Sequence, residues 1–332
     1  VGAGCIPAFA QKQLPNIIVM LSDDQGWGDL GFTGNTFVQT PNIDRIAHEG
    51  TILENFYVCP VSSPTRAEFL TGRYVRSGVN STTGGGERFN LGEKTIAEYF
   101  REAGYATSLF GKWHSGTQYP YHPNARGFEE FYGFCSGHWG NYWNPVLEHN
   151  GEIISGEGFI IDDLTDKALD YIRDHKEHPF FMFLSYNTPH SPMQVPDSWW
   201  NRVKDRTLSQ RATFPEQEDT TFTKAALALA ENLDWNIGRV LSLLHSLDLE
   251  QETIVIYFSD NGPNSFRWNG GMKGRKGSTD EGGVRSPFCI RWPGHIRKGA
   301  VETQLSGAID LIPTLLGLAG IEYTPLRKLD GI

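Results

Sequence analysis

The sequence predicts an α/β fold built on a large, mainly parallel sheet that helices cover on both faces. Short apolar runs alternate along the chain with segments of helical period, which is the pattern of successive strand–helix–strand units. The runs are apolar on both faces, as strands covered by helices on each side must be. Polar and charged residues directly follow several of them. The expected strands span 16–21, 105–110, 179–186, 253–258 and 287–292.

Helices fit between these strands. Thr40-Pro41 is expected to cap a helix that begins near Asn42, with the proline in the first turn, where its missing N–H costs nothing. The clearest helix spans about 224–247, because its apolar residues recur at helical spacing. Further helices are expected at 94–103, 164–172 and 310–318, and the chain shows no internal repeat or low-complexity segment.

Composition excludes several classes of protein. The chain has 332 residues, with 29 Lys and Arg against 39 Asp and Glu, which gives a net charge of −10. We therefore expect no nucleic-acid partner, because a broad basic face is what binds phosphates. No apolar run approaches the roughly 20 residues that span a bilayer, so no membrane span is expected. The four cysteines lack metal-ligand spacing, and at most one disulfide is expected.

The beginning of the chain suggests export. Residues 1–10 are interpreted as the remnant of a signal peptide, because Ala8-Phe9-Ala10 fits the small-x-small cleavage site. This interpretation favours a periplasmic or secreted protein whose mature part starts near Gln11. The alternative is an ordinary frayed terminus.

Residues able to bind ions and move protons follow four of the expected strands. Ligands of open α/β sheets bind at the carboxyl ends of the strands, so these residues are expected to meet at one edge. The acidic pairs offer only oxygen ligands, which favours Ca²⁺, or else Mg²⁺, over Zn²⁺. The alternative is that each pair is an exposed turn or a helix cap. Asp23 and Asp24 follow the strand at 16–21, and Lys112 and His114 follow the strand at 105–110. His190 follows the strand at 179–186, and Asp260 and Asn261 follow the strand at 253–258.

Two other segments favour an anion site. A Ser/Pro cluster from Ser62 to Arg66 leads into an apolar helical run, which places backbone N–H groups and a cation at a helix N-terminus. Taken alone, this cluster is equally compatible with an ordinary N-cap. The segment 273–287 concentrates positive charge in an acidic protein, either as an anion pocket or as a solvated loop.

Together these motifs resemble the formylglycine-dependent sulfatase family of the alkaline phosphatase superfamily, in its serine-type bacterial form. The signature Cys/Ser-x-Pro-x-Arg followed by Thr-Gly is matched by Ser62, Pro64, Arg66 and Thr71-Gly72, whereas Pro60 follows Cys59 and spoils that spacing. Further matches occur in order at 23–31, 40–47, 111–114, 189–192, 259–262 and 276–283.

The resemblance implies a role for each matched residue. Ser62 would be converted after translation to formylglycine, so a serine-type maturase is an implied partner. Arg66 would steady the hydrated aldehyde, and Lys112 and Lys276 would bind sulfate oxygens. His190 would protonate the leaving alcohol, and His114 would contact the nucleophile's hydroxyl. The implied Ca²⁺ ligands are Asp23, Asp24, Asp260, Asn261 and the modified Ser62.

The resemblance further implies hydrolysis of a sulfate monoester, with a sulfated carbohydrate as the expected substrate. Residues 11–325 would form the catalytic domain, and 326–332 would begin a small C-terminal domain that is otherwise missing. Two alternatives stay open: a phosphonate or phosphodiester hydrolase of the same superfamily, and a non-catalytic sulfoglycan-binding homologue.

A few residues near the motifs have no fixed role in the family pattern. Lys273 and Arg275 could hold a second anionic group or point to solvent. The aromatic residues His138, Trp139 and Trp268 could line a sugar pocket or serve ordinary packing.

Overall fold

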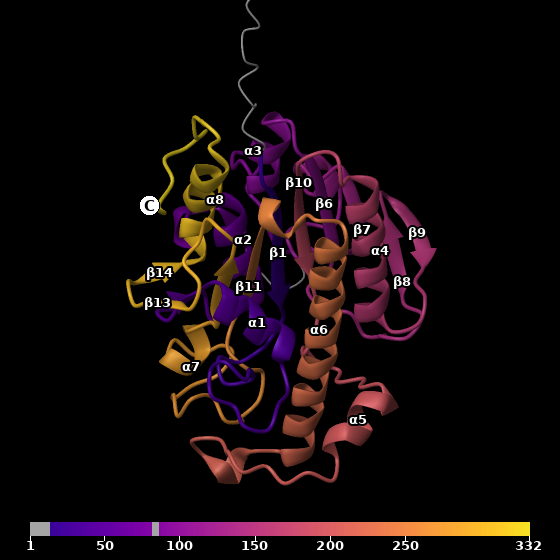
Figure 1. Ribbon diagram of the computed structural model, residues 1–332, viewed down its shortest axis with the longest axis vertical. Helices are drawn as coiled ribbons and strands as arrows, with labels where there is room; N and C mark the ends of the chain where they lie inside the picture. Colours follow the sequence, from indigo (N-terminus) through magenta and orange to yellow (C-terminus); the bar gives the residue numbers. More distant parts are fainter. Residues whose placement is uncertain (1–13, 82–85) are drawn as a thin grey trace, which may run out of the picture.

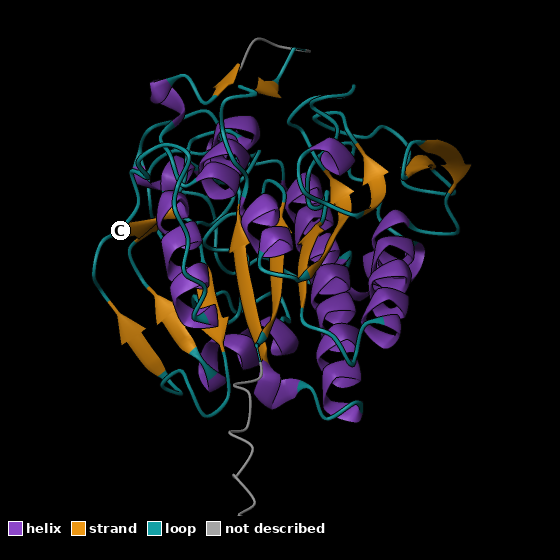
Figure 2. Cartoon of the chain, turned by 90° about the horizontal axis from the view of Figure 1, so that it is seen from above, coloured by secondary structure: helices purple, strands orange, loops and turns teal. Residues whose placement is uncertain are grey.

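The computed structural model describes residues 14–81 and 86–332. The predicted signal-peptide remnant at 1–10 and the mature start near Gln11 lie outside these residues. The described part contains one large sheet with the strand order β13-β2-β12-β11-β1-β10-β6-β7-β8-β9, and helices pack on it (Figures 1 and 2). The fold is therefore the predicted α/β architecture.

The middle of this sheet is parallel. Its five central strands, from one side to the other, are β11 (Thr253–Ser259), β1 (Asn16–Ser22), β10 (Phe180–Ser185), β6 (Ala106–Lys112) and β7 (Glu130–Phe134). Because these strands are parallel, their carboxyl ends lie along one edge of the sheet.

Shorter strands extend the sheet on both sides. On the β11 side are β12 (Phe288–Arg291), β2 (Thr51–Leu53) and β13 (Ala300–Glu302), and on the β7 side β8 (Val146–His149) and β9 (Glu152–Ser155). Two further pairs join β3 (Phe56–Tyr57) with β14 (Ser306–Gly307) and β4 (Asn80–Ser81) with β5 (Arg88–Phe89).

Helices bury both faces of the sheet. One apolar cluster joins the sheet to α2 (Ser62–Thr71), α3 (Ile96–Glu102) and α8 (Leu311–Ala319), and the other joins it to α1 (Pro41–Glu49), α4 (Ile160–Asp174) and α6 (Thr220–Ser246). In β1, Val19 belongs to the first cluster and its neighbours Ile18 and Met20 to the second, and all three are fully buried. Successive side chains of a strand point to opposite faces, so a central strand must be apolar throughout. Shorter helices are α5 (Asp197–Val203) and α7 (Glu281–Val284).

Most of the predicted elements are confirmed, and the differences have local causes. The predicted strand at 287–292 is β12, which pairs antiparallel to β11. Thr40 is the N-cap residue of α1, as predicted, but its side chain caps no backbone N–H group because its hydroxyl donates to Asp44 instead. The carboxylate of Asp234, on α6, accepts the first backbone N–H groups of α1, from Asn42 and Ile43.

The remaining sequence predictions concern membrane spans, cysteines and the end of the chain. No helix of the described residues is long and apolar enough to cross a membrane. Cys59, Cys135 and Cys289 are free thiols. Near the end of the chain, Asp330 contacts the residue that follows α2, because the Gly72 carbonyl accepts its N–H group. The division into domains 11–325 and 326–332 stays a prediction.

Candidate active site

The predicted site residues meet at the carboxyl edge of the parallel strands. β1 and β11 are neighbours with Ser22 opposite Ser259, so Asp23-Asp24 and Asp260-Asn261 emerge side by side. β10 and β6 lie on the other side of β1 and bring in the segments that carry His190, Lys112 and His114, while Ser62 and Arg66 lie in the first turns of α2. Residues far apart in the chain thus share one buried polar centre.

Ser62 lies in the middle of this centre. Its hydroxyl donates to Oδ2 of Asp260 at 2.6 Å and accepts from Nε of Arg66 at 2.8 Å. Nδ1 of His114 lies 3.4 Å from the same oxygen. Ser62 is 3% exposed, so these three groups surround an almost enclosed hydroxyl.

The guanidinium of Arg66 links the groups around Ser62 through hydrogen bonds. It donates to Asp260 Oδ2 at 3.0 Å, to Ser185 Oγ at 2.5 Å and to the Lys112 carbonyl at 3.2 Å. Arg66 and Asp260 are both fully buried, which removes them from competing water. The sequence interpretation missed Ser185, the last residue of β10, which nothing in the sequence distinguishes from any other strand-end serine.

Two lysines neutralise the aspartates after β1. Lys112 Nζ lies 2.7 Å from Asp23 Oδ2, both fully buried, and Lys276 Nζ lies 2.6 Å from Asp24 Oδ1. Burial alone would raise the pKa of Asp23, but Lys112 and the other nearby cations outweigh it and hold the pKa well below its ordinary value. Burial would likewise lower the pKa of Lys276, but Asp24 and Asp23 outweigh it and raise the pKa. Asp23 and Lys276 are therefore charged, whereas burial lowers the pKa of Lys112 against the opposing attraction of Asp23.

The donor set fits a hard cation. Among the described residues, the buried oxygens Asp23 Oδ1, Asp24 Oδ2 and Asn261 Oδ1 accept no hydrogen bond. Buried polar atoms without a partner are rare, and three of them from adjacent strand ends mark a place for a ligand that binds oxygen. Asp23 and Asp24 each offer one oxygen to a lysine and keep the other free, so a cation and the lysines can share them.

Two site residues have strained backbones. Asp24 has φ 63° and His114 has φ 57°, in the left-handed region that residues with a Cβ rarely adopt. Room for the His114 ring comes from Gly137, where a Cβ atom would lie 2.5 Å from its Nε2. Burial, together with Lys112 and Arg66, lowers the pKa of His114 to about 2, so its imidazole is neutral.

His190 faces the aspartates from the other side. Its Nδ1 lies 2.8 Å from the Ser191 carbonyl and so carries a proton, while its Nε2 lies 3.5 Å from Asp24 Oδ2. The Tyr142 hydroxyl donates to the His190 carbonyl at 2.7 Å. The exposed His138 ring stacks on His190 with 6.0 Å between ring centres, so of the aromatic candidates it lies nearest the site histidines.

The other candidates do not join the site. Lys273 is 71% exposed and pairs with Asp280, and the Arg275 guanidinium packs over Phe266. The Trp139 ring stacks on Phe134. Trp268 lines a small cavity near Asp29 rather than the cation oxygens.

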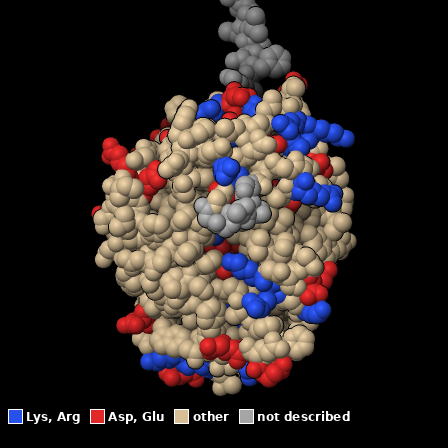
Figure 3. Space-filling view, turned by 180° about the vertical axis from the view of Figure 1, so that it is seen from behind, with Lys and Arg blue, Asp and Glu red and all other residues tan. Residues whose placement is uncertain are grey.

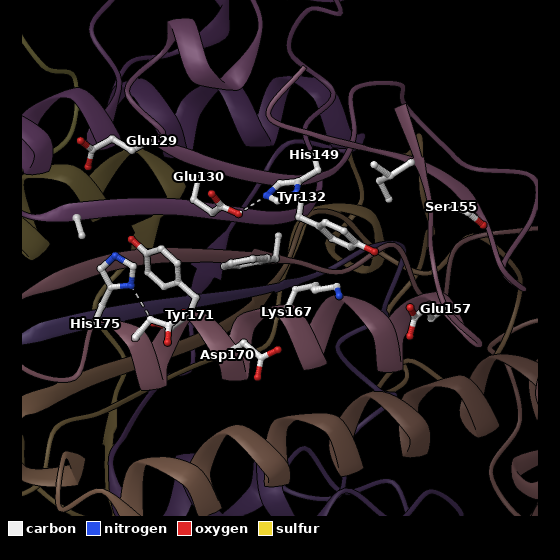
Figure 4. A pocket seen from close by; sticks show the side chains of 14 residues that line it. Glu129, Glu130, Tyr132, His149, Ser155, Glu157, Lys167, Asp170, Tyr171 and His175 are labelled. Carbon is white, nitrogen blue, oxygen red and sulfur yellow. Dashed lines mark hydrogen bonds and ion pairs between the residues drawn. The ribbon is translucent and has the colours of Figure 1, made fainter. Parts of the chain in front are cut away.

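Two larger hollows lie on the surface. A cavity of about 470 Å³ reaches His114 and is also lined by Glu87, Arg88, Gln118 and Tyr121. A separate groove of about 720 Å³ between α4 and the strands β7–β9 contains none of the site residues (Figure 4). Of these two hollows, the cavity beside His114 is the one that a site residue lines. On the face shown in Figure 3, basic and acidic side chains are interspersed and neither sign forms a continuous surface.

Comparison with known proteins decides the family. A family model described as Sulfatase matches residues 15–321. The chain belongs to the sulfatase family. The segment matched includes every residue of the site, from Asp23 to Lys276.

Similar proteins include sulfatases from Homo sapiens and Pseudoalteromonas sp.. N-acetylgalactosamine-6-sulfatase of Homo sapiens is 32% identical over 361 residues, covering 98% of this chain and 66% of the relative. This sulfatase chain thus spans about two thirds of the length of that relative. The crystal structure of Ps i-CgsB in complex with k-i-k-neocarrahexaose is 32% identical, with a TM-score of 0.87 over 96% of this chain and 75% of that one. PsFucS1 sulfatase from Pseudoalteromonas sp. is 26% identical, with a TM-score of 0.80, over 97% of this chain and 71% of that one.

Proposed function

We propose that this sulfatase-family chain hydrolyses a sulfate monoester on a sulfated carbohydrate, using a formylglycine made from Ser62 and a bound Ca²⁺. The ester bond between oxygen and sulfur is cleaved with water, which yields the free alcohol, sulfate and a proton. The observation that carries the proposal is the enclosed Ser62 hydroxyl between Asp260, Arg66 and His114.

Ser62 as a plain serine is a poor candidate for the nucleophile. A serine that attacked sulfur would leave a stable sulfate ester, whereas the hydrate of an aldehyde offers a second hydroxyl through which sulfate is expelled. Formation of that aldehyde requires a serine-type maturase as a partner. When bound, Ca²⁺ would supply a positive charge that stabilises negative charge developing on the sulfate oxygens.

The protein's own residues would position the reacting groups. Asp23, Asp24, Asp260 and Asn261 would hold the cation with the modified residue 62. Arg66 donates to the oxygen at position 62 and keeps it oriented. The neutral imidazole of His114, with Nδ1 facing that oxygen, can accept its proton.

The remaining charged residues would act on the substrate. Lys112 and Lys276, which pair with Asp23 and Asp24, would also interact with the sulfate oxygens. Their positive charges would stabilise these oxygens as they become more negative while the ester bond breaks. His190 would donate the proton on Nε2 to the leaving alcohol. The Ser191 carbonyl already holds its Nδ1, which leaves Nε2 as the nitrogen free for transfer.

The substrate class is supported by the relatives. The name of the human relative refers to a sulfated amino sugar, and the structure of Ps i-CgsB contains a neocarrahexaose. We infer that the chain takes a sulfated glycan or a fragment of one. Export to the periplasm or the medium, predicted from residues 1–10, would place it where such glycans are found.

A parallel ester panel tests the proposal. The matured protein and a Ser62→Ala control are given N-acetylgalactosamine 6-sulfate, carrageenan oligosaccharides, and matching phosphate and phosphonate esters, with Ca²⁺ present. Sulfate release by the matured protein alone supports the proposal. Preferential hydrolysis of the phosphorus esters would favour the phosphonate or phosphodiester alternative, and tight glycan binding without turnover would favour a binding protein.

A further inference from the structure

Behind the proposed cation site lies a buried ion pair, Arg267 and Asp29, to which the proposed mechanism gives no role. The Arg267 Nε lies 2.8 and 3.0 Å from the two Asp29 oxygens, and its Nη2 lies 2.7 Å from Oδ2. Both side chains are 1% exposed. Burying two charges costs about as much free energy as the pair returns, so such a pair points to a geometric role rather than to stability.

The same guanidinium binds the backbone of a proposed cation ligand. Arg267 Nη2 donates to the main-chain carbonyl of Asp24 at 2.9 Å. On the other side of the residue, the N–H group of Asp24 donates to Asp260 Oδ1 at 3.1 Å. Both polar groups of the Asp24 backbone are therefore held, and the residue keeps its left-handed φ of 63°. This fixes the direction in which the Asp24 carboxylate leaves the chain.

The remaining contacts make the arrangement rigid. Arg267 Nη1 donates to Asn264 Oδ1 at 3.2 Å and to Ser265 Oγ at 2.9 Å, so every N–H group of the guanidinium has an acceptor. Asp29 Oδ2 also accepts the N–H of Gly26 at 2.7 Å, which closes the loop from Asp24 to Asp29. Lysine, a point charge with three donors, cannot reproduce this planar fork.

We propose that Arg267 and Asp29 are positioning residues that hold Asp24 in the orientation a cation needs, and so set the affinity of the site for Ca²⁺. The inference rests on the cation part of the proposed function. Substitution of residues that hold metal ligands in place through hydrogen bonds commonly lowers metal affinity by about 10- to 100-fold.

Calorimetric titration with Ca²⁺ tests this inference on protein with an unmodified Ser62, so that neither maturation nor turnover enters. Arg267→Lys and Asp29→Asn are each expected to weaken Ca²⁺ binding by at least about tenfold. The matched control is Arg291→Lys. Arg291 is also buried, with Nε 2.9 Å from Glu49 and Nη2 3.0 Å from Glu250, but it lies outside the cation site.

The outcomes separate this inference from the function beneath it. The inference is supported if both variants bind Ca²⁺ more weakly while Arg291→Lys binds it unchanged. The three variants are compared at similar stability, judged by the midpoint of urea unfolding. Unchanged affinity in both variants, or an equal loss in the control, overturns it. If Arg267→Lys does not fold, Asp29→Asn decides, because the amide oxygen can still accept from Gly26. No Ca²⁺ binding by the unsubstituted chain, in the unmodified and the matured form alike, would instead overturn the cation site of the proposed function, and this inference with it.

Discussion

His190 provides the sharpest test of the proposed chemistry. Its Nδ1 is held by the Ser191 carbonyl at 2.8 Å, so Nε2 is the nitrogen from which a proton can reach the leaving group. Nε2 itself lies 3.5 Å from Asp24 Oδ2, so it faces the group of site aspartates. His190→Ala removes this donor without touching Ser62 or Arg66.

The size of the effect depends on the leaving group. A positioned general acid contributes about 10²- to 10⁴-fold, or about 3 to 5 kcal/mol of barrier, when the leaving oxygen must be protonated. Sugar sulfates release a poor leaving group and are expected to lose this whole factor. Activated aryl sulfates release a stable phenolate and are expected to lose less than about tenfold.

The assay compares kcat/KM for a sugar sulfate and a nitrophenyl sulfate in His190→Ala and in a control, His138→Ala. His138 lies beside His190, with ring centres 6.0 Å apart, but among the described residues its side chain makes no hydrogen bond or ion pair with the site aspartates. The control is expected to change both substrates equally. An equal loss on both substrates in His190→Ala would show that His190 is not the acid.

Three further predictions follow from the buried charges. Asp260→Ala removes the acceptor of Ser62 and the partner of Arg66, so Ca²⁺ binding and turnover should disappear together; turnover that persists in the presence of a chelator contradicts the cation assignment. Lys112→Met leaves Asp23 charged and unpaired, so urea unfolding should show a loss of about 3 to 5 kcal/mol, and a loss below about 1 kcal/mol would refute the ion pair. Burial raises the pKa of Asp234 from 3.8 to about 7, so the folded state holds its proton more tightly and stability should fall by up to about 4 kcal/mol as pH rises from 4 to 7. In Asp234→Asn, the free energy of unfolding in urea should no longer fall in this way between pH 5 and 8. A decline as large as in the unsubstituted protein would contradict the prediction.

The fold was predictable because its central strands have no solvent-facing side. Runs such as Asn16–Ser22, whose five interior residues are all apolar, are typical of strands that are buried on both faces. The short strands β2, β7, β8, β9 and β13 were not predicted. β7 is the last strand of the parallel middle, and the other four lie toward the sides of the sheet. Polar residues such as Glu130, Glu148 and Glu152 interrupt the apolar pattern there, so pairing with neighbouring strands decides the structure.

The site was predictable in part. Asp23, Asp260 and His190 follow central strands, and parallel topology brings strand ends together whatever the details of packing. Ser185, Arg267 and the backbone conformation of Asp24 were not predictable, because their contacts join segments that no local pattern relates. The side chain that caps α1 was not predictable for the same reason, because it is that of Asp234, which belongs to α6 and is far from Thr40 in the sequence.

The most direct test of the account is the mass of the peptide that carries Ser62, from protein produced together with a serine-type maturase. The account predicts the loss of two hydrogens at Ser62 and reaction of the peptide with a hydrazine, in a preparation that releases sulfate. An unmodified serine in a preparation that releases sulfate equally well would contradict it.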